Sequence, residues 1–202
     1  MKTDVAVIIL AAGHSNRMGE CKFLLAMPHV SLAPRLSFFE TIVKTYTDFG
    51  TAEIIVVTQP KHLKELQNLK VKNQFTIHFV LNNQPERERF YSLQLGIKHL
   101  VNAEYCFVQN ADSPFVDTKS LDLLYQNRSK ADCISPSFQG QSGHPVLLNK
   151  NTLNFLSTAN SDSNLKDLLQ NRSKYKVVTE NALITVDIDT PADYHYYFKT
   201  TP

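Results

Sequence analysis

The chain has 202 residues, of which 43% are hydrophobic and 20% are charged, with a formal net charge of +2. This is enough apolar material for one well-cored domain, residues 1–202, and scattered charges of this balance argue against a nucleic-acid surface or a polybasic membrane segment. The three cysteines are far apart and form no C-x-x-C pair, so neither a structural zinc site nor a disulfide framework is indicated. No apolar run reaches the roughly 18 residues of a membrane-spanning helix, and we expect a cytoplasmic protein.

The first element is the apolar run at 5–10, which lacks polar alternation and therefore predicts a strand buried on both faces of a parallel sheet. Ligands bind at the C-terminal ends of such strands. Small residues follow at 11–13, where a base or ribose could lie against the backbone, and Gly13 can adopt a positive φ. Arg17 and Lys22 add positive charge, which predicts a phosphate-binding loop. Its glycine spacing fits neither a Walker loop nor a Rossmann fingerprint.

The next elements alternate between strand and helix patterns. Apolar runs at 53–58, 75–81, 104–109 and 132–136 are separated by helix-period segments such as 38–49 and 92–101. This alternation predicts an α/β fold with a doubly wound, mostly parallel sheet. Three strand-like segments, 143–149, 174–180 and 182–188, then surround a polar helix-prone block at 151–172. They predict an antiparallel excursion in the C-terminal third.

The strand expected at 104–109 leads directly to Asp112. A carboxylate at this edge of the sheet, beside a phosphate loop, is placed to hold Mg²⁺, which takes one or two carboxylates together with substrate phosphate oxygens. The same residue could instead cap the turn before Pro114. The residues alone leave both interpretations open.

A second pair of carboxylates, Asp187 and Asp189, follows the β-branched residues near the C-terminus. Alternate residues of a strand point the same way, so the pair could complete a divalent-cation site with Asp112, or could form a solvated strand end. Thr190, Pro191 and Asp193 fit the N-cap, N1 and N3 positions of a following helix. Which aspartate faces inward stays open.

Residues 10–25, LAAGHSNRMGECKFLL, resemble the L-A-A-G-x-S-x-R-M-G-x-x-K-x-L-L signature of the MobA-like nucleotidyltransferases, in particular their molybdopterin cytidylyltransferase branch. The match has no gaps. Cys21 stands where family members often have proline or another residue, and Ala12 slightly favours the cytidylyl over the guanylyl branch.

The resemblance implies a GT-A-like fold and Mg²⁺-dependent transfer of a nucleoside monophosphate, preferably CMP, from an NTP to a phosphorylated acceptor such as molybdopterin, with release of pyrophosphate. A molybdoenzyme is then a possible partner. The resemblance assigns catalysis to Arg17, Lys22 and Asp112, and Mg²⁺ binding to Asp112 with Asp187 or Asp189. It assigns nucleotide contacts to Leu10, Ala11, Ala12, Gly13, Lys22, Asn82 and Ser92, and it places His144 near the acceptor.

Several of these positions also have purely structural interpretations. Asn82 fits a turn former, Ser92 a helix-start cap, and His144 a hydrogen-bonded turn residue. Ala111 and Glu88 replace family glycines, and the charged run at 86–89 is typical of a solvated face, although it would alter nucleotide choice if it lined the cleft.

Two other functions fit the same residues. One is a nucleotidyltransferase for a sugar phosphate or another alcohol phosphate. The other, from a different class, is a non-catalytic nucleotide sensor or a chaperone that delivers a cofactor. Convergence of Asp112 with Asp187 or Asp189 would favour an enzyme. A serine hydrolase is disfavoured because no G-x-S-x-G elbow is present.

Overall fold

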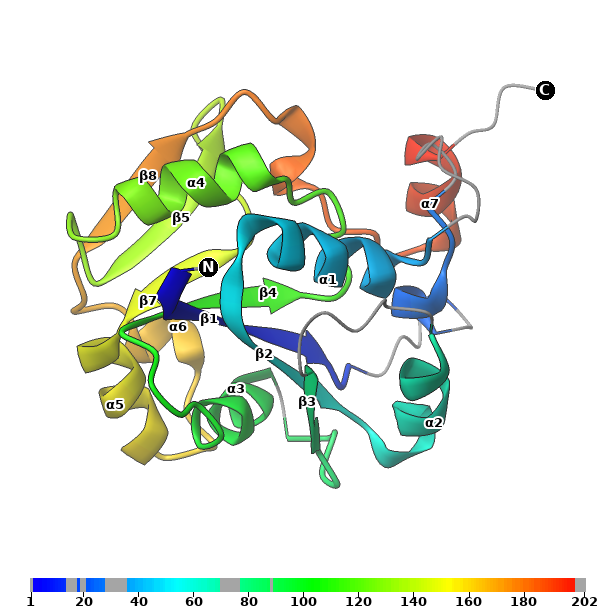
Figure 1. Cartoon of the computed structure of the whole chain (residues 1–202), viewed down its shortest axis with the longest axis horizontal. Helices are drawn as coiled ribbons and strands as arrows, with labels where there is room; N and C mark the ends of the chain where they lie inside the picture. Colours follow the sequence, from blue (N-terminus) through cyan, green and yellow to red (C-terminus); the bar gives the residue numbers. More distant parts are fainter. Residues whose placement is uncertain are drawn as a thin grey trace.

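The computed structural model describes residues 2–13, 18, 21–27, 36–69, 77–87 and 89–198. Its central sheet is covered by α1 and α4 on one face and by α3 and α5 on the other (Figure 1). The strands are β1 (Lys2–Ala11), β2 (Thr51–Thr58), β3 (Ile77–Leu81), β4 (Tyr105–Asn110), β5 (Cys133–Phe138), β6 (Gln141–Ser142), β7 (Val146–Asn149) and β8 (Lys174–Val178). The α-helices are α1 (Phe38–Phe49), α2 (Pro60–Asn68), α3 (Arg89–Ile97), α4 (Thr118–Gln126), α5 (Lys150–Thr158), α6 (Leu165–Leu168) and α7 (Pro191–Tyr197). Two 3-10 helices, η1 (Lys22–Leu24) and η2 (Ala182–Thr185), complete the described elements.

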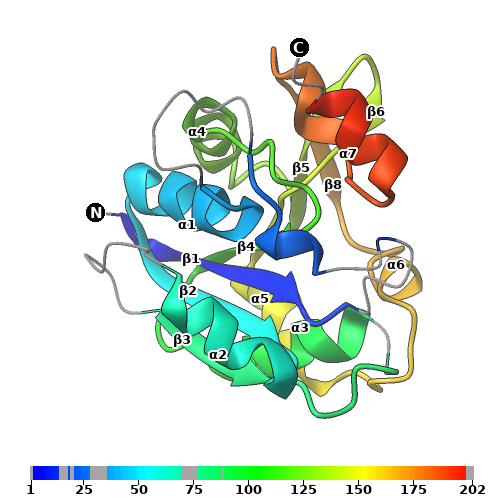
Figure 2. The same cartoon turned by 90° about the vertical axis from the view of Figure 1, so that its right-hand side faces the viewer.

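The sheet has the order β3-β2-β1-β4-β7-β5-β6, with β8 paired to β5. β3, β2, β1 and β4 are parallel neighbours, whereas β7 runs antiparallel to both β4 and β5. The predicted doubly wound, mostly parallel sheet with an antiparallel excursion is therefore confirmed. Figure 2 shows the same layers from the side.

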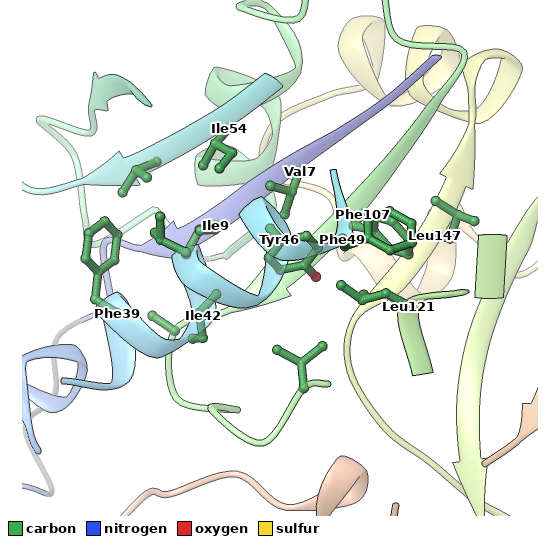
Figure 3. Packing of buried hydrophobic residues seen from close by; sticks show 14 of the residues in the cluster. Val7, Ile9, Phe39, Ile42, Tyr46, Phe49, Ile54, Phe107, Leu121 and Leu147 are labelled. Atoms are coloured by element: carbon green, nitrogen blue, oxygen red, sulfur yellow. The ribbon is translucent and has the colours of Figure 1, made fainter. Parts of the chain in front are cut away.

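β1 lies at the centre of the sheet, and its two faces build two different parts of the core. Val7 and Ile9 pack with α1 on one face, while Ala6 and Ile8 belong to a second cluster on the α3 face. Figure 3 shows Ile42, Tyr46 and Phe49 of α1 beside the first of these faces. Burial on both sides explains why this strand has no polar alternation.

One expected strand is wrong. Residues 182–185 form η2, and the chain from 186 to 189 has no regular secondary structure. The Asn181 side chain accepts a hydrogen bond from the backbone N–H of Leu183, which caps this turn. The Ile188 backbone N–H donates to the Asp112 carbonyl at 2.8 Å. The segment therefore satisfies its backbone groups with a turn and a loop instead of a strand ladder.

One helix boundary differs from the prediction and one agrees with it. The helix expected at 92–101 begins at Arg89 and ends at Ile97. The start of α7 is as predicted, because Thr190 and Asp193 form a reciprocal capping box with Pro191 at N1. Among the described residues, no helix is long and apolar enough to cross a membrane.

Candidate active site

The candidate site lies where β1 and β4 end. These neighbouring parallel strands are in register from Val5 with Tyr105 to Leu10 with Asn110, so the loops that follow them meet at one edge of the sheet. A cavity of about 440 Å³ opens there. Its lining residues come from the ends of β1 and β4, from α3 and from the segment before α3: Leu10, Ala12, Gly13, Pro85, Glu86, Arg89, Ser92, Asn110 and Asp112.

Asp112 lies in the turn after β4, and buried side chains fix that turn. Gln109 Nε2 donates to the carbonyls of Asn110 and Ser113, at 2.8 and 2.9 Å. The hydroxyl of Tyr46 in turn donates to Gln109 Oε1 at 3.0 Å. Asp112 Oδ1 is buried and has no hydrogen-bond partner among the described residues. Asp112 Oδ1 is thus left without a partner among the described residues, in a turn whose backbone is fixed by the Gln109 side chain.

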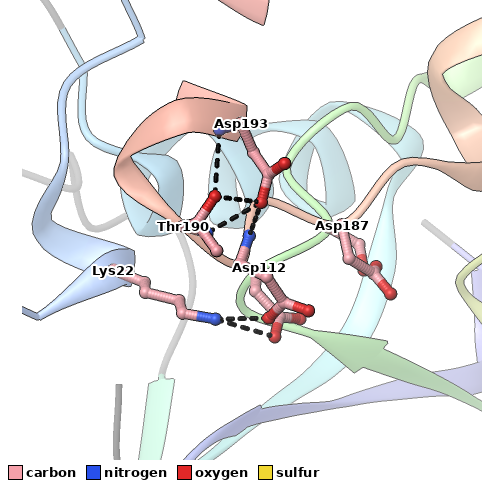
Figure 4. Close-up of polar contacts among 7 residues, drawn as sticks. Lys22, Asp112, Asp187, Thr190 and Asp193 are labelled. Atoms are coloured by element: carbon pink, nitrogen blue, oxygen red, sulfur yellow. Dashed lines mark hydrogen bonds and ion pairs between the residues drawn. The ribbon is translucent and has the colours of Figure 1, made fainter. Parts of the chain in front are cut away.

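Lys22, the first residue of η1 in the signature segment 10–25, lies beside this carboxylate. Its Nζ lies 2.5 Å from Asp189 Oδ1 and 3.8 Å from Asp112 Oδ2, and only 10% of the side chain is exposed (Figure 4). A buried ammonium needs compensating charge, and two carboxylates supply it here. The predicted lysine and aspartates therefore do converge.

Asp187 and Asp189 flank Ile188, which is fully buried and hydrogen-bonded to the Asp112 backbone. Asp187 accepts a hydrogen bond from the Ser113 hydroxyl, while Asp189 pairs with Lys22. Asp187 therefore contacts the Asp112 turn, and Asp189 contacts the lysine beside it. The alternation argument assumed a strand at this place, and the segment is not one. Figure 4 shows Lys22 and Asp187 on opposite sides of Asp112.

The electrostatics of Asp112 reflect this crowding. Burial is the largest effect and raises the pKa of the carboxyl, and the charge of Asp187 raises it further. Lys22 and Arg89 act in the opposite direction, and Asp189 adds a smaller upward effect. A cation placed beside Asp112 would therefore relieve an unfavourable concentration of negative charge.

His144 belongs to the same neighbourhood. Its Nδ1 is buried without a hydrogen-bond partner among the described residues, and its backbone N–H donates to the Ile184 carbonyl. Burial lowers the pKa of the imidazole, Arg89 lowers it further and Asp187 raises it. The residue that sequence analysis placed on the acceptor side thus lies against η2, whose Ile184 is three residues before Asp187 in the chain.

The predicted nucleotide contacts divide into two groups. Leu10, Ala12, Gly13 and Ser92 line the cavity, whereas Ala11 is packed in the core. Gly13 does not use a positive φ, and no atom of the described residues lies within 4 Å of the position that a Cβ would take there. It therefore serves the cavity by leaving room for a ligand.

Asn82 and Ser92 form a buried pair behind this wall. Asn82 Nδ2 donates to Ser92 Oγ at 2.9 Å, and Asn82 Oδ1 accepts from the backbone N–H of Gln84 at 2.8 Å. Ser92 is an interior residue of α3, so its interpretation as a helix-start cap is wrong. Asn82 acts as a turn former that also orients Ser92.

Two of the predicted positions cannot be placed, because Arg17 and Glu88 lie outside the described residues. Glu86 and Arg89 line the cavity, which agrees with the alternative interpretation of their charged run and not with a purely solvated face. Arg89 was not among the predicted site residues, and its place in this run before Ser92 was the signal for it.

Residues 7–177 match the family model of the MobA-like NTP transferase domain. The chain belongs to this family. It is 29% identical over 187 residues to the molybdenum cofactor cytidylyltransferase of Escherichia coli K12, covering 93% of this chain and 92% of that protein. Its fold is also similar to the Rv0371c protein of Mycobacterium tuberculosis, with a TM-score of 0.79 and 17% identity over 98% of this chain and 100% of the other. A complex of that protein with manganese gives a TM-score of 0.75 and 15% identity over the same shares of the two chains.

These comparisons confirm the predicted family and the GT-A-like fold. They also confirm that the chain is an enzyme of the nucleotidyltransferase class, related to a cytidylyltransferase.

Proposed function

We propose that the enzyme transfers CMP from CTP to a phosphorylated pterin acceptor such as molybdopterin, with release of pyrophosphate and dependence on Mg²⁺. The observation that carries the proposal is Asp112, which lines the 440 Å³ cavity beside Lys22 and has a buried carboxylate oxygen with no hydrogen-bond partner among the described residues. The preference for CTP is supported by the cytidylyltransferase relative and by Ala12 in the signature.

The residues present fit a hard divalent cation. Asp112 offers a buried oxygen that has no partner in the described part of the chain, and Asp187 is exposed nearby, whereas Asp189 is already paired with Lys22. Among the described residues, no group of three or more His, Cys, Asp or Glu side chains is arranged to hold a metal ion. Asp112 and Asp187 would therefore hold the cation jointly with substrate phosphate oxygens, which suits Mg²⁺. When bound there, the cation neutralises charge on those oxygens.

A manganese complex has been determined for the Rv0371c protein, which shares the fold. This supports a divalent cation in the family's architecture, and Mg²⁺ and Mn²⁺ both accept carboxylate oxygens.

The chain's own residues supply charge and position. In the reaction an oxygen of the acceptor phosphate bonds to the α-phosphorus, the bond to the β-phosphate oxygen breaks, and pyrophosphate leaves with that electron pair. Because the acceptor phosphate enters ionised, no side-chain nucleophile is needed. Lys22 stabilises the charge that develops on the phosphate oxygens, and its present partner Asp189 holds it in place before the nucleotide binds. Arg17 is assigned to the same task by the signature.

Two alternatives use the same site. Transfer to a sugar phosphate or another alcohol phosphate would need the same phosphate-directed groups and a different acceptor pocket. A non-catalytic sensor or cofactor-delivery chaperone would retain the nucleotide wall but has no need for Lys22 between two carboxylates. The clustering of Lys22, Asp112 and Asp189 therefore supports transfer.

The test is calorimetric titration of CTP, GTP, ATP and UTP, each with and without Mg²⁺, on the wild type, Lys22→Ala and Lys44→Ala. Lys44 is a matched control because it pairs with Asp48 at 2.6 Å on an exposed helix face. We expect selective, Mg²⁺-dependent binding of CTP that is lost only in Lys22→Ala, followed by pyrophosphate release when molybdopterin is added. Preference for another nucleotide would overturn the choice of CMP, and absence of pyrophosphate release would overturn the acceptor.

A further inference from the structure

Arg89 is a cation on the cavity wall that the family signature does not explain. It is the first residue of α3 and lines the cavity together with Ser92 and Asp112. It makes no hydrogen bond or ion pair with the residues that the structure describes, and its side chain is exposed. Its charge is therefore available to a ligand.

Arg87, two residues earlier, has a different role. Its Nη2 lies 2.6 Å from Asp162 Oδ1 and also donates to the Ser161 hydroxyl, and its guanidinium carbon lies 4.4 Å from the centre of the Tyr91 ring. This arginine ties the segment before α3 to the loop after α5. The same short run thus contains one arginine that holds the structure and one that faces the cavity.

Arg89 lines the same cavity as Asp112, whose carboxylate belongs to the cluster of acidic groups around Lys22. Three carboxylates gather there against Lys22, and Lys22 is already paired. A nucleotide adds more negative charge, so a second cation at this end would offset repulsion that Lys22 alone leaves.

We propose that Arg89 is a further substrate-binding residue that holds a phosphate group of the nucleotide from the α3 side of the cavity, on the wall formed with Ser92. This rests on the proposed function, since it takes an NTP as the ligand. A guanidinium presents paired N–H donors that match two phosphate oxygens, and such charge-assisted hydrogen bonds are stronger than neutral ones. Arg89 would therefore bind the phosphates of the nucleotide, and other residues would contact the base.

The experiment measures the affinity of CTP, CMP and cytidine, with Mg²⁺ present, on the wild type and on Arg89→Ala, Arg89→Lys and Arg87→Ala. We expect Arg89→Ala to weaken CTP binding about ten- to a hundredfold and to leave cytidine unchanged. Arg89→Lys should restore part of the affinity, because it keeps the charge without the paired donors. Arg87→Ala should keep wild-type CTP affinity and lower the unfolding temperature instead.

The outcomes separate this inference from the proposed function. If the wild type binds CTP and Arg89→Ala binds it equally well, Arg89 does not hold phosphate, while the proposed function stands. An equal loss of affinity for CTP and cytidine would also overturn the inference, since it would mean a contact with the base or ribose. If the wild type binds no nucleotide, both proposals fail. Circular dichroism of Arg89→Ala should match the wild type, because an exposed side chain contributes little to folding.

Discussion

Gly143 offers a direct test of how the fold positions the candidate site. It is buried beside η2, and a Cβ added there would lie 2.0 Å from the Ile184 carbonyl oxygen and 2.6 Å from its carbonyl carbon. Both atoms belong to the backbone, so no change of rotamer relieves the contact. Because real Cβ contacts are essentially never shorter than 3.0 Å, Gly143→Ala must separate the two segments by at least the difference, 1.0 Å.

The displaced segment continues into the site. Residues 186–189 follow η2 directly, Ile188 is hydrogen-bonded to the Asp112 backbone, and Asp189 holds Lys22. A shift of about 1 Å in a positioning segment can lower a rate by about a hundredfold. Overpacking of this kind costs about 1–3 kcal/mol, which lowers the Tm of a protein of this size by roughly 2–12 °C. We therefore expect Gly143→Ala to lose most of its kcat while it remains folded at 25 °C.

The assay is pyrophosphate release with CTP and the acceptor, with the thermal unfolding of each variant measured in parallel. Gly140→Ala is the matched control: Gly140 has a φ of +84°, but no atom of the part of the chain that the structure describes lies within 4 Å of an added Cβ, so the substitution brings only backbone strain of about 1–2 kcal/mol. It should lower the Tm and leave kcat unchanged. Wild-type kcat in Gly143→Ala, or an equal loss of kcat in Gly140→Ala, would refute the proposed coupling between this glycine and the site.

Three further changes test other parts of the structure. Burial raises the pKa of Asp112 above its ordinary value of 3.8, so the folded protein binds the proton of this carboxyl more tightly than the unfolded chain does. The free energy of unfolding therefore falls as the pH rises from 3.8 through the raised pKa. Asp112→Asn in metal-free protein should therefore raise the Tm at pH 7, lose this advantage below pH 3.8 and abolish transfer; a lower Tm at pH 7 would contradict the argument. Gly13→Ala adds a methyl group to the cavity wall at a place where no atom of the described residues lies within 4 Å. Calorimetry should therefore show weaker nucleotide binding at an unchanged Tm, and unchanged affinity would mean that the ligand lies elsewhere. Tyr46→Phe removes the donor to the buried Gln109 Oε1, which should cost about 1–3 kcal/mol in urea unfolding, and no loss would show that this bond does not hold the Asp112 turn.

The strands and the helix start at Thr190 could be predicted because their causes are local or strongly patterned. A central parallel strand such as β1 needs apolar residues on both faces, and a capping box needs particular residues at fixed spacing. The segment at 182–188 has the composition of a strand, yet its partners are a turn and the Asp112 loop. Those partners lie far away in the chain, and no local pattern reveals them.

The same distinction holds for the site. Asp112 could be placed at the edge of the sheet because the ends of parallel strands meet there. The pairing of Lys22 with Asp189 joins residues 167 positions apart, and only the family resemblance brought them together beforehand. Arg87 and Arg89 are both arginines of one charged run, and the sequence does not distinguish them. Their three-dimensional contacts do, because Arg87 pairs with Asp162 whereas Arg89 lines the cavity.

The site combines rigid backbone with unfavourable side-chain electrostatics. Ile188 is fully buried and anchors the backbone between Asp187 and Asp189, while Gln109 holds the Asp112 turn through two hydrogen bonds. The anchored carboxylates repel one another, and Asp112 Oδ1 remains without a partner among the described residues. A fold that only had to be stable would gain from neutral side chains at these positions. The surrounding core instead holds charged groups close together. A site that binds a cation and a polyphosphate requires this arrangement, because the charged side chains gain their full set of partners only when the substrates bind.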